Sequence, residues 1–398
     1  MLADALVIIA PDLAHGGSVG AVAWRHALEL SRSFKVYVIT RAVPDGVPAN
    51  IEPVIVRHSG WNWLRRFCHV PNELSFLWAA REALKKLGTR ESIKAVWCHS
   101  HGAAALVASP LKRTLGCRTV MTTHGDIFDR PAGTYSRELT WFYKKVTPMA
   151  YRQTDVVHAL SPYMVEWAVK GGSARDQVRL VPNGIDPQDI GATALVPRAA
   201  DSFMSAGTLR LLYVGSLWSV KGVDVLIRAV AELNAIPTGM AVSLTLIGEG
   251  TLRHELEGLV AALGLEKQVS FLGRVPRRNL LPHYQAADIL CVPSISEALP
   301  TVALEAMLCG LPVVGSNTGG IPFLVNEGVN GYLATPGDVA SLGRAIAKAA
   351  ASRGHLAELG EQSFIKARAG FGWAGIAIQL AELVSAPVFP QPIPSQGS

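Results

Sequence analysis

Short apolar runs alternate with stretches of helical pattern along most of this chain, and this alternation limits the fold more than any other feature. Runs of this length, bounded by turn residues, predict strands that are buried on both faces. Such strands belong to parallel sheets covered by helices, as in α/β proteins. The predicted strands are Leu6–Ile9, Val36–Ile39, Val54–Val56, Ala95–Cys98, Thr119–Thr122, Val156–Ala159, Val178–Val181, Leu211–Val214, Leu244–Ile247, Val269–Leu272, Ile289–Val292, Val313–Gly315 and Tyr332–Ala334.

The strand pattern is interrupted between residues 183 and 207. This stretch mixes Pro, Gly, Ala and Asp without periodicity, which indicates a linker between domains. A chain of 398 residues is long enough for two domains of ordinary size. We therefore predict two Rossmann-like domains, residues 1–190 and 191–371, followed by a helix at 372–386. Residues 387–398 are rich in Pro, Gln and Ser, so we expect this tail to be disordered.

Composition excludes several classes of protein. Hydrophobic residues make up 49% of the chain, yet no apolar run is long enough to span a bilayer. The run Ala5–Ala10 is short and follows Asp4, so we interpret it as a first strand rather than a signal peptide and expect a cytoplasmic chain. Scattered cysteines without metal-ligand spacing predict buried free thiols and no disulfides. They are Cys68, Cys98, Cys117, Cys291 and Cys309.

The net charge of +6 suits nucleic acid, an anionic membrane surface or anionic substrates. No nucleic-acid motif accompanies this charge, so nucleic acid ranks last among the three.

The stretch from Ser294 to Gly310 carries the most chemical information. It follows a predicted strand and turns into a helix with Pro300 near its first position and Gly310 just past its end. Glu297 lies in the loop and Glu305 within the helix, with seven residues between them. Because the first turn of a helix offers unpaired N–H groups, this segment suits a ligand that carries both phosphate and hydroxyls. Two solvated surface carboxylates are the alternative.

The first predicted domain carries further candidates at strand ends. Gly16 and Gly17 lie between the first strand and a helix, where backbone can approach an anion, although a tight connection is equally compatible. His124 follows the strand Thr119–Thr122, at the sheet edge where such domains bind ligands. His99 and His101 have His-x-His spacing without a nearby carboxylate or cysteine, so we interpret them as loop residues and not as a metal site. The candidate acceptor-pocket residues beyond His124 are Asp126, Asp129 and Arg130.

Taken together, an ordered set of short motifs resembles glycosyltransferase family 4 (group 1). The resemblance covers about residue 8 to about residue 380, and each motif is weak alone. The resemblance implies a GT-B fold, in which an N-terminal acceptor domain and a C-terminal nucleotide-sugar-binding domain face a central cleft and the last helix crosses back to the first domain. The motifs are Gly16-Gly17, Thr123-His124-Gly125, Val181 to Asp186, Val214-Gly215, Lys221-Gly222, Ile247 to Gly250, Phe271 to Gly273, the Glu297/Glu305 pair and Gly319 to Pro322.

The resemblance also implies a reaction. A retaining glycosyltransferase would move a hexosyl-type sugar from a nucleotide diphosphate sugar to a hydroxyl acceptor, with front-face attack and no protein nucleophile. Glu305 would hold the ribose, Glu297 the sugar and diphosphate, and His124 would orient the transferred group. The chain has no Asp-x-Asp, so we expect fixed charges such as Lys221 to replace a metal, and no cofactor. The predicted donor-binding residues are Gly16, Gly17, Gly215, Ser216, Lys221, Gly273, Arg274, Glu297, Ala298, Leu299, Pro300, Thr301 and Glu305.

Two departures from the family pattern keep other functions open. Ser216 stands where members commonly have Arg, and Phe323 where Glu often follows Gly-Gly-x-Pro. A nucleotide-sugar-binding protein that has lost transfer is therefore one alternative, and a GT-B phosphorylase or epimerase is another. The acceptor would be a glycan or lipid-linked saccharide in cell-envelope or exopolysaccharide biosynthesis, or else a small molecule such as inositol, an aminocyclitol or a natural product.

One surface hypothesis concerns membranes. The stretch Trp61–Phe67 interleaves aromatic and basic residues, and Lys144, Lys145 and Arg152 lie on the predicted helix Glu138–Arg152. This mixture is typical of interfacial segments and predicts peripheral association with the inner face of the plasma membrane. The alternative is that the aromatic residues cap the domain core.

Overall fold

The computed structural model describes residues 4–11, 13–14, 18–56, 70–99, 103–124, 137–204, 207–236 and 241–385. The chain divides into two compact units. Unit 1 is Met1–Val181 with Ala374–Ser398, and unit 2 is Pro182–Trp373. Each unit is built around one parallel sheet.

Unit 1 contains a seven-stranded parallel sheet in the order β3-β2-β1-β4-β5-β6-β7. The order reverses between β1 and β4, which pair directly, so the carboxyl ends of these strands form the switch point where such sheets bind ligands. The strands are β1 (Ala5–Ile9), β2 (Lys35–Thr40), β3 (Ile51–Ile55), β4 (Ile93–His99), β5 (Arg118–Thr123), β6 (Val156–Ala159) and β7 (Val178–Leu180).

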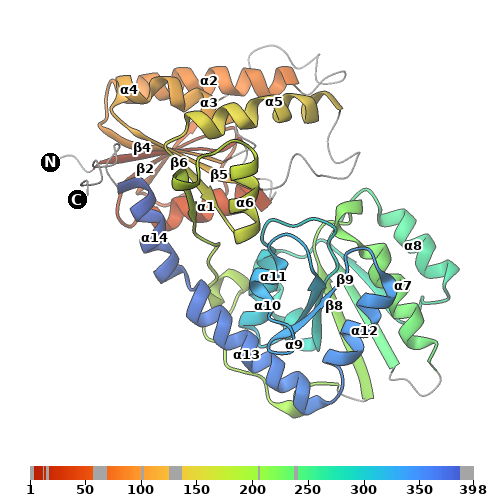
Figure 1. The fold of residues 1–398 in the computed structure, drawn as a ribbon. Helices are drawn as coiled ribbons and strands as arrows, with labels where there is room; N and C mark the ends of the chain where they lie inside the picture. The colour runs from red at the N-terminus through yellow and green to blue at the C-terminus, as the bar shows by residue number, and fades with distance from the viewer. Residues whose placement is uncertain are drawn as a thin grey trace, which may run out of the picture. The chain divides into compact units, whose positions relative to one another are not determined.

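Helices cover both faces of this sheet (Figure 1). On one face α2 (Val70–Gly88), α3 (Ala103–Ala108) and α5 (Arg137–Gln153) pack against one another, and α3 contacts β4 and β5. The other helices include α1 (Ser18–Leu30), which contacts β2 and β4, and α6 (Pro162–Lys170), which contacts β6 and β7. The remaining helices of the unit are α4 (Lys112–Leu115) and α14 (Trp373–Ser385), whose first residue belongs to unit 2.

Unit 2 contains a six-stranded parallel sheet in the order β10-β9-β8-β11-β12-β13. Its order reverses between β8 and β11, so the second switch point lies at the carboxyl ends of these two strands. The strands are β8 (Thr208–Val214), β9 (Ala241–Ile247), β10 (Val269–Gly273), β11 (Ile289–Val292), β12 (Val313–Ser316) and β13 (Gly331–Ala334).

Two groups of helices enclose the sheet of unit 2. One group packs on β9, β12 and β13 and consists of α7 (Val223–Asn234), α8 (Arg253–Ala262) and α12 (Val339–Ala349). The other group contacts β8, β11 and β12 and consists of α9 (Leu281–Ala286), α10 (Thr301–Leu308) and α11 (Ile321–Leu324). The long helix α13 (Arg353–Phe371) packs along α10, which fixes the helix that carries Glu305.

The thirteen predicted strands are all present, so the predicted pair of Rossmann-like parallel sheets is confirmed. The reason is that strands buried on both faces need continuous apolar runs, and β1, for example, is buried at every position. The predicted helix start near Pro300 is also confirmed, since Pro300 is the N-cap of α10.

The segment 183–207 differs from the prediction of a linker, because it belongs to unit 2. Ile185 pairs with Gly372, and its N–H donates to the carbonyl of Phe371 at 2.7 Å. Trp373 Nε1 donates to Asp189 at 3.0 Å. These contacts tie the beginning of unit 2 to its end, so the first unit ends at Val181 rather than at residue 190.

Among the described residues, no helix has the length and apolar character needed to cross a membrane. The described cysteines, Cys98, Cys117, Cys291 and Cys309, are buried and carry free thiols. Cys68 and the tail 387–398 lie outside the described residues.

Candidate functional site

The candidate site of unit 2 lies at its switch point, where the loops after β8 and β11 meet. Gly215 and Ser216 follow β8, and Ser294 to Pro300 follow β11. Because β8 and β11 pair directly, these two loops leave the sheet beside each other. The predicted donor residues on both loops therefore share one edge of the sheet.

Lys221 and Glu297 form an ion pair at this edge. Lys221 Nζ lies 2.6 Å from Glu297 Oε2, and both side chains are partly buried. Gly222 makes the approach possible because it adopts φ +62°, and a Cβ there would lie 2.2 Å from the carbonyl oxygen of Pro293. The loop of Lys221 is also joined to the Glu297 loop by a hydrogen bond from Ile295 N to Val220 O at 2.8 Å. Backbone contacts thus fix the ammonium against the carboxylate.

The backbone of Glu297 is held by the Gly319-Gly320 turn. Gly320 N donates to Glu297 O at 2.9 Å. Gly319 adopts φ +58°, and a Cβ at this position would lie 1.8 Å from Glu297 O. The double glycine of the sequence motif is therefore required by the close approach of two loops.

The N-terminus of α10 lies directly after Glu297. Pro300 is its N-cap, and no side chain among the described residues accepts from the first turn. The first-turn amides and the helix dipole favour an anion here. Leu299 is buried, whereas Ala298 and Thr301 are partly exposed, so the backbone just after Glu297 is accessible on one side.

Glu305 has a different environment from Glu297. Its side chain is only 3% exposed, and its two oxygens accept from Arg277 Nε and Tyr284 Oη, each at 2.7 Å. Burial raises the pKa of Glu305, and the Arg277 charge and the Tyr284 hydroxyl oppose this rise without cancelling it. Asp189 Oδ1 lies 4.0 Å from Nη1 of Arg277. Sequence reasoning missed Arg277 and Tyr284, because neither lies in a recognisable motif.

The remaining predicted donor residues occupy strand ends of the same sheet. Gly273 ends β10 and accepts from Gly248 N at 2.8 Å, and Arg274 beyond it is exposed. Ser216 offers its carbonyl to the Tyr213 hydroxyl at 2.8 Å. Burial and the nearby Glu297 charge raise the pKa of Tyr213, so this hydroxyl remains a donor.

Phe323, the second departure from the family pattern, packs against the last residue of α13, Phe371. Its ring packs edge-to-face on Phe371 with centroids 5.7 Å apart. The aromatic side chain therefore contributes to packing at the end of α13.

In unit 1 the structure corrects the interpretation of His99. This residue ends β4 and is fully buried, so it is not a loop residue. Its Nδ1 lies 2.9 Å from Nε2 of His124, which follows β5. The sequence contained a signal for this pair, because both histidines stand at the carboxyl ends of neighbouring strands.

Gly16, Gly17, Asp126, Asp129 and Arg130 lie outside the described residues, as do His101 and Gly125.

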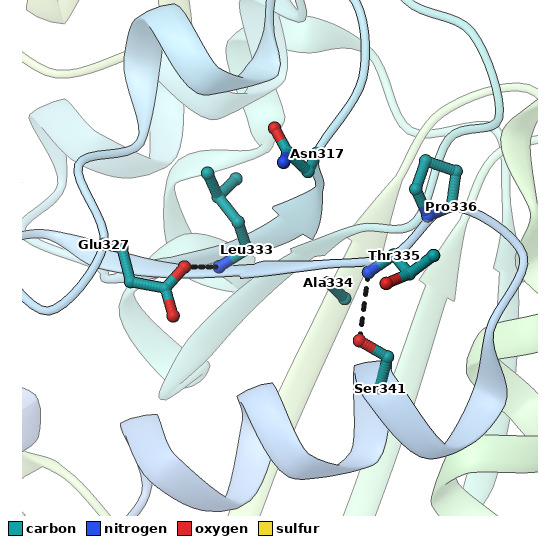
Figure 2. Close-up of a pocket in the computed structure, with 7 residues that line it drawn as sticks. All are labelled: Asn317, Glu327, Leu333, Ala334, Thr335, Pro336 and Ser341. Atoms are coloured by element: carbon teal, nitrogen blue, oxygen red, sulfur yellow. Dashed lines mark hydrogen bonds between the residues drawn. The ribbon is translucent and has the colours of Figure 1, made fainter.

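Figure 2 shows a separate pocket at the ends of β12 and β13. Thr335 N donates to Ser341 Oγ at 3.0 Å, and Leu333 N donates to Glu327 at 3.2 Å. None of the predicted site residues lines this pocket. Its lining residues are Asn317, Glu327, Leu333, Ala334, Thr335, Pro336 and Ser341.

Two family models match this chain. The model described as Glycosyltransferase Family 4 matches residues 16–189, and the model described as Glycosyl transferases group 1 matches residues 202–365. A D-inositol 3-phosphate glycosyltransferase of Nocardia farcinica is 33% identical over 220 residues, which are 54% of this chain and 49% of that protein. The match thus spans about half the length of this curated relative.

Solved structures share the fold over nearly the whole chain. A sucrose-phosphate synthase from Thermosynechococcus elongatus has a TM-score of 0.79 at 23% identity, covering 96% of this chain and 98% of that one. Anabaena HepE, solved in complex with UDP and glucose, has a TM-score of 0.73 at 21% identity, covering 96% and 99%. These likenesses show a GT-B type of fold.

Proposed function

Since the chain belongs to glycosyltransferase family 4, the group 1 glycosyltransferases, we propose that it transfers a hexosyl group from a nucleotide diphosphate sugar to a hydroxyl of its acceptor. The observation that carries this proposal is the Lys221–Glu297 ion pair beside the N-terminus of α10, where no side chain among the described residues accepts a hydrogen bond from the first turn. A cation and helix amides at one sheet edge suit a diphosphate, and a carboxylate beside them suits sugar hydroxyls.

The donor diphosphate would bind the backbone of Ala298 to Thr301 together with Lys221. In the free protein the Lys221 ammonium is paired with Glu297, so an incoming diphosphate adds a second anion to the same cation. Glu297 then accepts hydrogen bonds from the sugar. Fixed charges of this kind stabilise the diphosphate as it leaves, because they need no reorganisation during the reaction.

Glu305 would accept from the ribose hydroxyls. Its oxygens already accept from Arg277 and Tyr284, but each carboxylate oxygen has further acceptor capacity. Since the side chain is 3% exposed, ribose binding requires the Arg277 side chain, which is 38% exposed, to move aside.

The proposed reaction retains configuration at the anomeric carbon. The bond between this carbon and the diphosphate oxygen breaks, and the acceptor oxygen bonds to the same face. The leaving diphosphate oxygen takes the proton from the acceptor hydroxyl, so no protein nucleophile is needed. Lys221 and the α10 amides supply the charge stabilisation, and we propose that no divalent metal is required.

The acceptor we favour is a lipid-linked saccharide, because two helices of unit 1 that contact each other, α2 and α5, carry exposed apolar and basic side chains, which together we call the α2/α5 face. Helices α2 and α5 lie side by side on one side of the sheet (Figure 1). Helix α5 exposes three basic side chains, Lys144, Lys145 and Arg152. Its acidic residue, Glu138, lies in the first turn, so the rest of the helix is basic. Exposed aromatic residues among basic ones favour an anionic membrane surface. The exposed apolar side chains are Leu74 (47%), Trp78 (63%), Trp141 (64%) and Met149 (45%).

This face replaces the stretch Trp61–Phe67 as the basis of the membrane hypothesis, because that stretch lies outside the described residues. Transfer to a small cyclitol is the second candidate, and the Nocardia farcinica relative favours it.

Two measurements test the proposed function. A thermal-shift screen of UDP-, GDP- and ADP-sugars should identify the donor, because a ligand that binds only the folded state raises its melting temperature. Release of the nucleotide should then depend on an added acceptor. If the protein binds a donor but releases no nucleotide when a glycan, a lipid-linked saccharide or a cyclitol is added, it is a binding protein and not a transferase. A requirement for inorganic phosphate would indicate a phosphorylase.

Vesicle co-sedimentation tests the membrane partner. The protein should bind vesicles that contain anionic lipid at low salt, and the double variant Trp78→Ser/Trp141→Ser should bind them less. Trp218→Ser is the matched control, since Trp218 is also exposed but lies in unit 2. Equal binding to neutral and anionic vesicles would contradict the proposal.

A further inference from the structure

A hydrogen bond joins two histidines at the switch point of unit 1. His99 is the last residue of β4, and His124 follows the end of β5, which pairs with β4 in register. The Nδ1 atom of His99 lies 2.9 Å from Nε2 of His124, and the ring centroids are 5.1 Å apart. His99 is fully buried, whereas His124 is partly exposed. Only the second imidazole can therefore meet a ligand.

His99 is held in a rigid aromatic cluster. Its ring stacks on Trp97 at an interplanar angle of 15°, and the ring of His26 packs on it edge-on with centroids 5.1 Å apart. Burial keeps the pKa of His99 well below its ordinary value, and His26, His124 and His158 lower it further. His99 is thus neutral and carries a single ring proton.

A neighbouring series of hydrogen bonds shows which ring nitrogens of this cluster carry a proton. The carbonyl oxygen of Val181 can only accept, so His158 Nε2 donates to it at 2.7 Å. Burial lowers the pKa of His158 to about 4, so its Nδ1 is an acceptor and receives the Thr122 hydroxyl at 3.0 Å. Trp97 Nε1 donates in turn to Thr122 at 2.7 Å. These hydrogen bonds fix the tautomer of His158 and the direction of the Thr122 hydroxyl.

The same reasoning selects a tautomer for the His99–His124 pair. Nε2 of His99 is buried and has no hydrogen-bond partner among the described residues. If His124 donated, His99 would carry its proton on this atom, as a buried N–H without a partner. Orphaned buried N–H groups are rarer in proteins than unpaired acceptors. The favoured arrangement therefore puts the proton on Nδ1 of His99, which donates to Nε2 of His124.

We infer that His99 is a positioning residue that holds His124 in the tautomer with its proton on Nδ1, so that His124 serves the transfer reaction as a hydrogen-bond donor and not as a base. The role of His124 in transfer rests on the proposed function, whereas the assignment of its tautomer does not. Because Nε2 of His124 already accepts from His99, this nitrogen cannot take a proton from an acceptor hydroxyl. In this tautomer the ring proton is on Nδ1, so any hydrogen bond that the imidazole donates to a sugar or phosphate oxygen comes from that atom.

Nitrogen NMR of histidine-labelled protein tests the tautomer without any activity assay. Two-bond proton–nitrogen correlations distinguish a protonated from an unprotonated ring nitrogen. At a pH of about 8, His124 should show a protonated Nδ1 and an unprotonated Nε2. The opposite assignment, or a mixture of the two tautomers, would overturn the inference.

A matched pair of variants tests the role of His99. The amide of His99→Asn can donate from nearly the position of Nδ1, whereas His99→Phe keeps a ring and removes the donor. We expect His99→Phe to lose the tautomer preference and to lower kcat on the order of 10-fold, with little change in the donor KM. His99→Asn should keep the tautomer and most of kcat.

The two variants also separate stability from positioning. If His99→Phe does not fold, the wild-type spectrum and His99→Asn still decide the question. Equal tautomer populations in the Phe and wild-type proteins would refute a positioning role. If the predicted tautomer is found but no acceptor supports transfer, the proposed function fails and the inference about the pair stands.

Discussion

Replacing Arg277 with Met should destabilise unit 2, because it leaves the buried carboxylate of Glu305 without its cation. Met preserves much of the aliphatic stem and removes the guanidinium that donates to Glu305 at 2.7 Å. Breaking a buried ion pair by removing one partner costs about 3–5 kcal/mol. Here Tyr284 still donates to the carboxylate, and the Arg277 side chain is 38% exposed, so water already screens the pair. We therefore expect a loss of about 2 kcal/mol, below the range for a fully buried pair.

The loss should increase with pH. The pKa of Glu305 is higher in the folded protein than its ordinary value, so the folded state binds this proton more tightly than the unfolded chain. The stability linked to such a group is present below the unfolded pKa and is lost as pH rises through the folded pKa. Removing Arg277 raises the folded pKa further. The difference in unfolding free energy between variant and wild type should therefore be smaller at about pH 5 than at about pH 8.

Thermal unfolding measured by circular dichroism at both pH values provides the assay. For a unit of this size, about 2 kcal/mol corresponds to a decrease in Tm of roughly 4–8 °C. Arg278→Met is the matched control, because Arg278 is the exposed neighbour on the same segment and should change Tm little. A decrease that is the same at both pH values, or one no larger than that of the control, would refute the reasoning.

Three further predictions concern the candidate donor site. Glu305→Gln should weaken nucleotide binding, whereas Glu297→Gln should lower kcat more than it weakens binding; calorimetry and initial rates check this, and wild-type values in both variants would disprove the assignment. Transfer should continue in EDTA, and complete loss restored by magnesium would contradict the metal-free mechanism. Gly222→Ala should lower both Tm and kcat, because its Cβ would lie 2.2 Å from Pro293 O and displace Lys221; an unchanged Tm would show that the loop tolerates the contact.

Much of the fold could be predicted from the sequence because its signals are local. An interior strand of a parallel sheet is buried on both faces, so it needs a continuous apolar run such as Ala5–Ile9. Helix α10 begins after Pro300 and ends before Gly310, which adopts φ +71°, and both residues mark helix ends by their own backbone preferences. The sequence predicted Lys221 and Glu297 as residues of one donor site, whereas the ion pair between them was found only in the structure.

Only the tertiary structure revealed which polar groups are buried together. The sequence gives no sign that Arg277 and Tyr284 enclose Glu305, because these residues come from separate segments. The segment 183–207 has the composition of a linker, but in the fold it belongs to unit 2. Ile185 pairs with Gly372, and Phe203 lies in the hydrophobic core of the unit. Local preferences determine strands, helices and turns, whereas the environment of a charge or an imidazole depends on residues far away in the chain that the fold brings into contact.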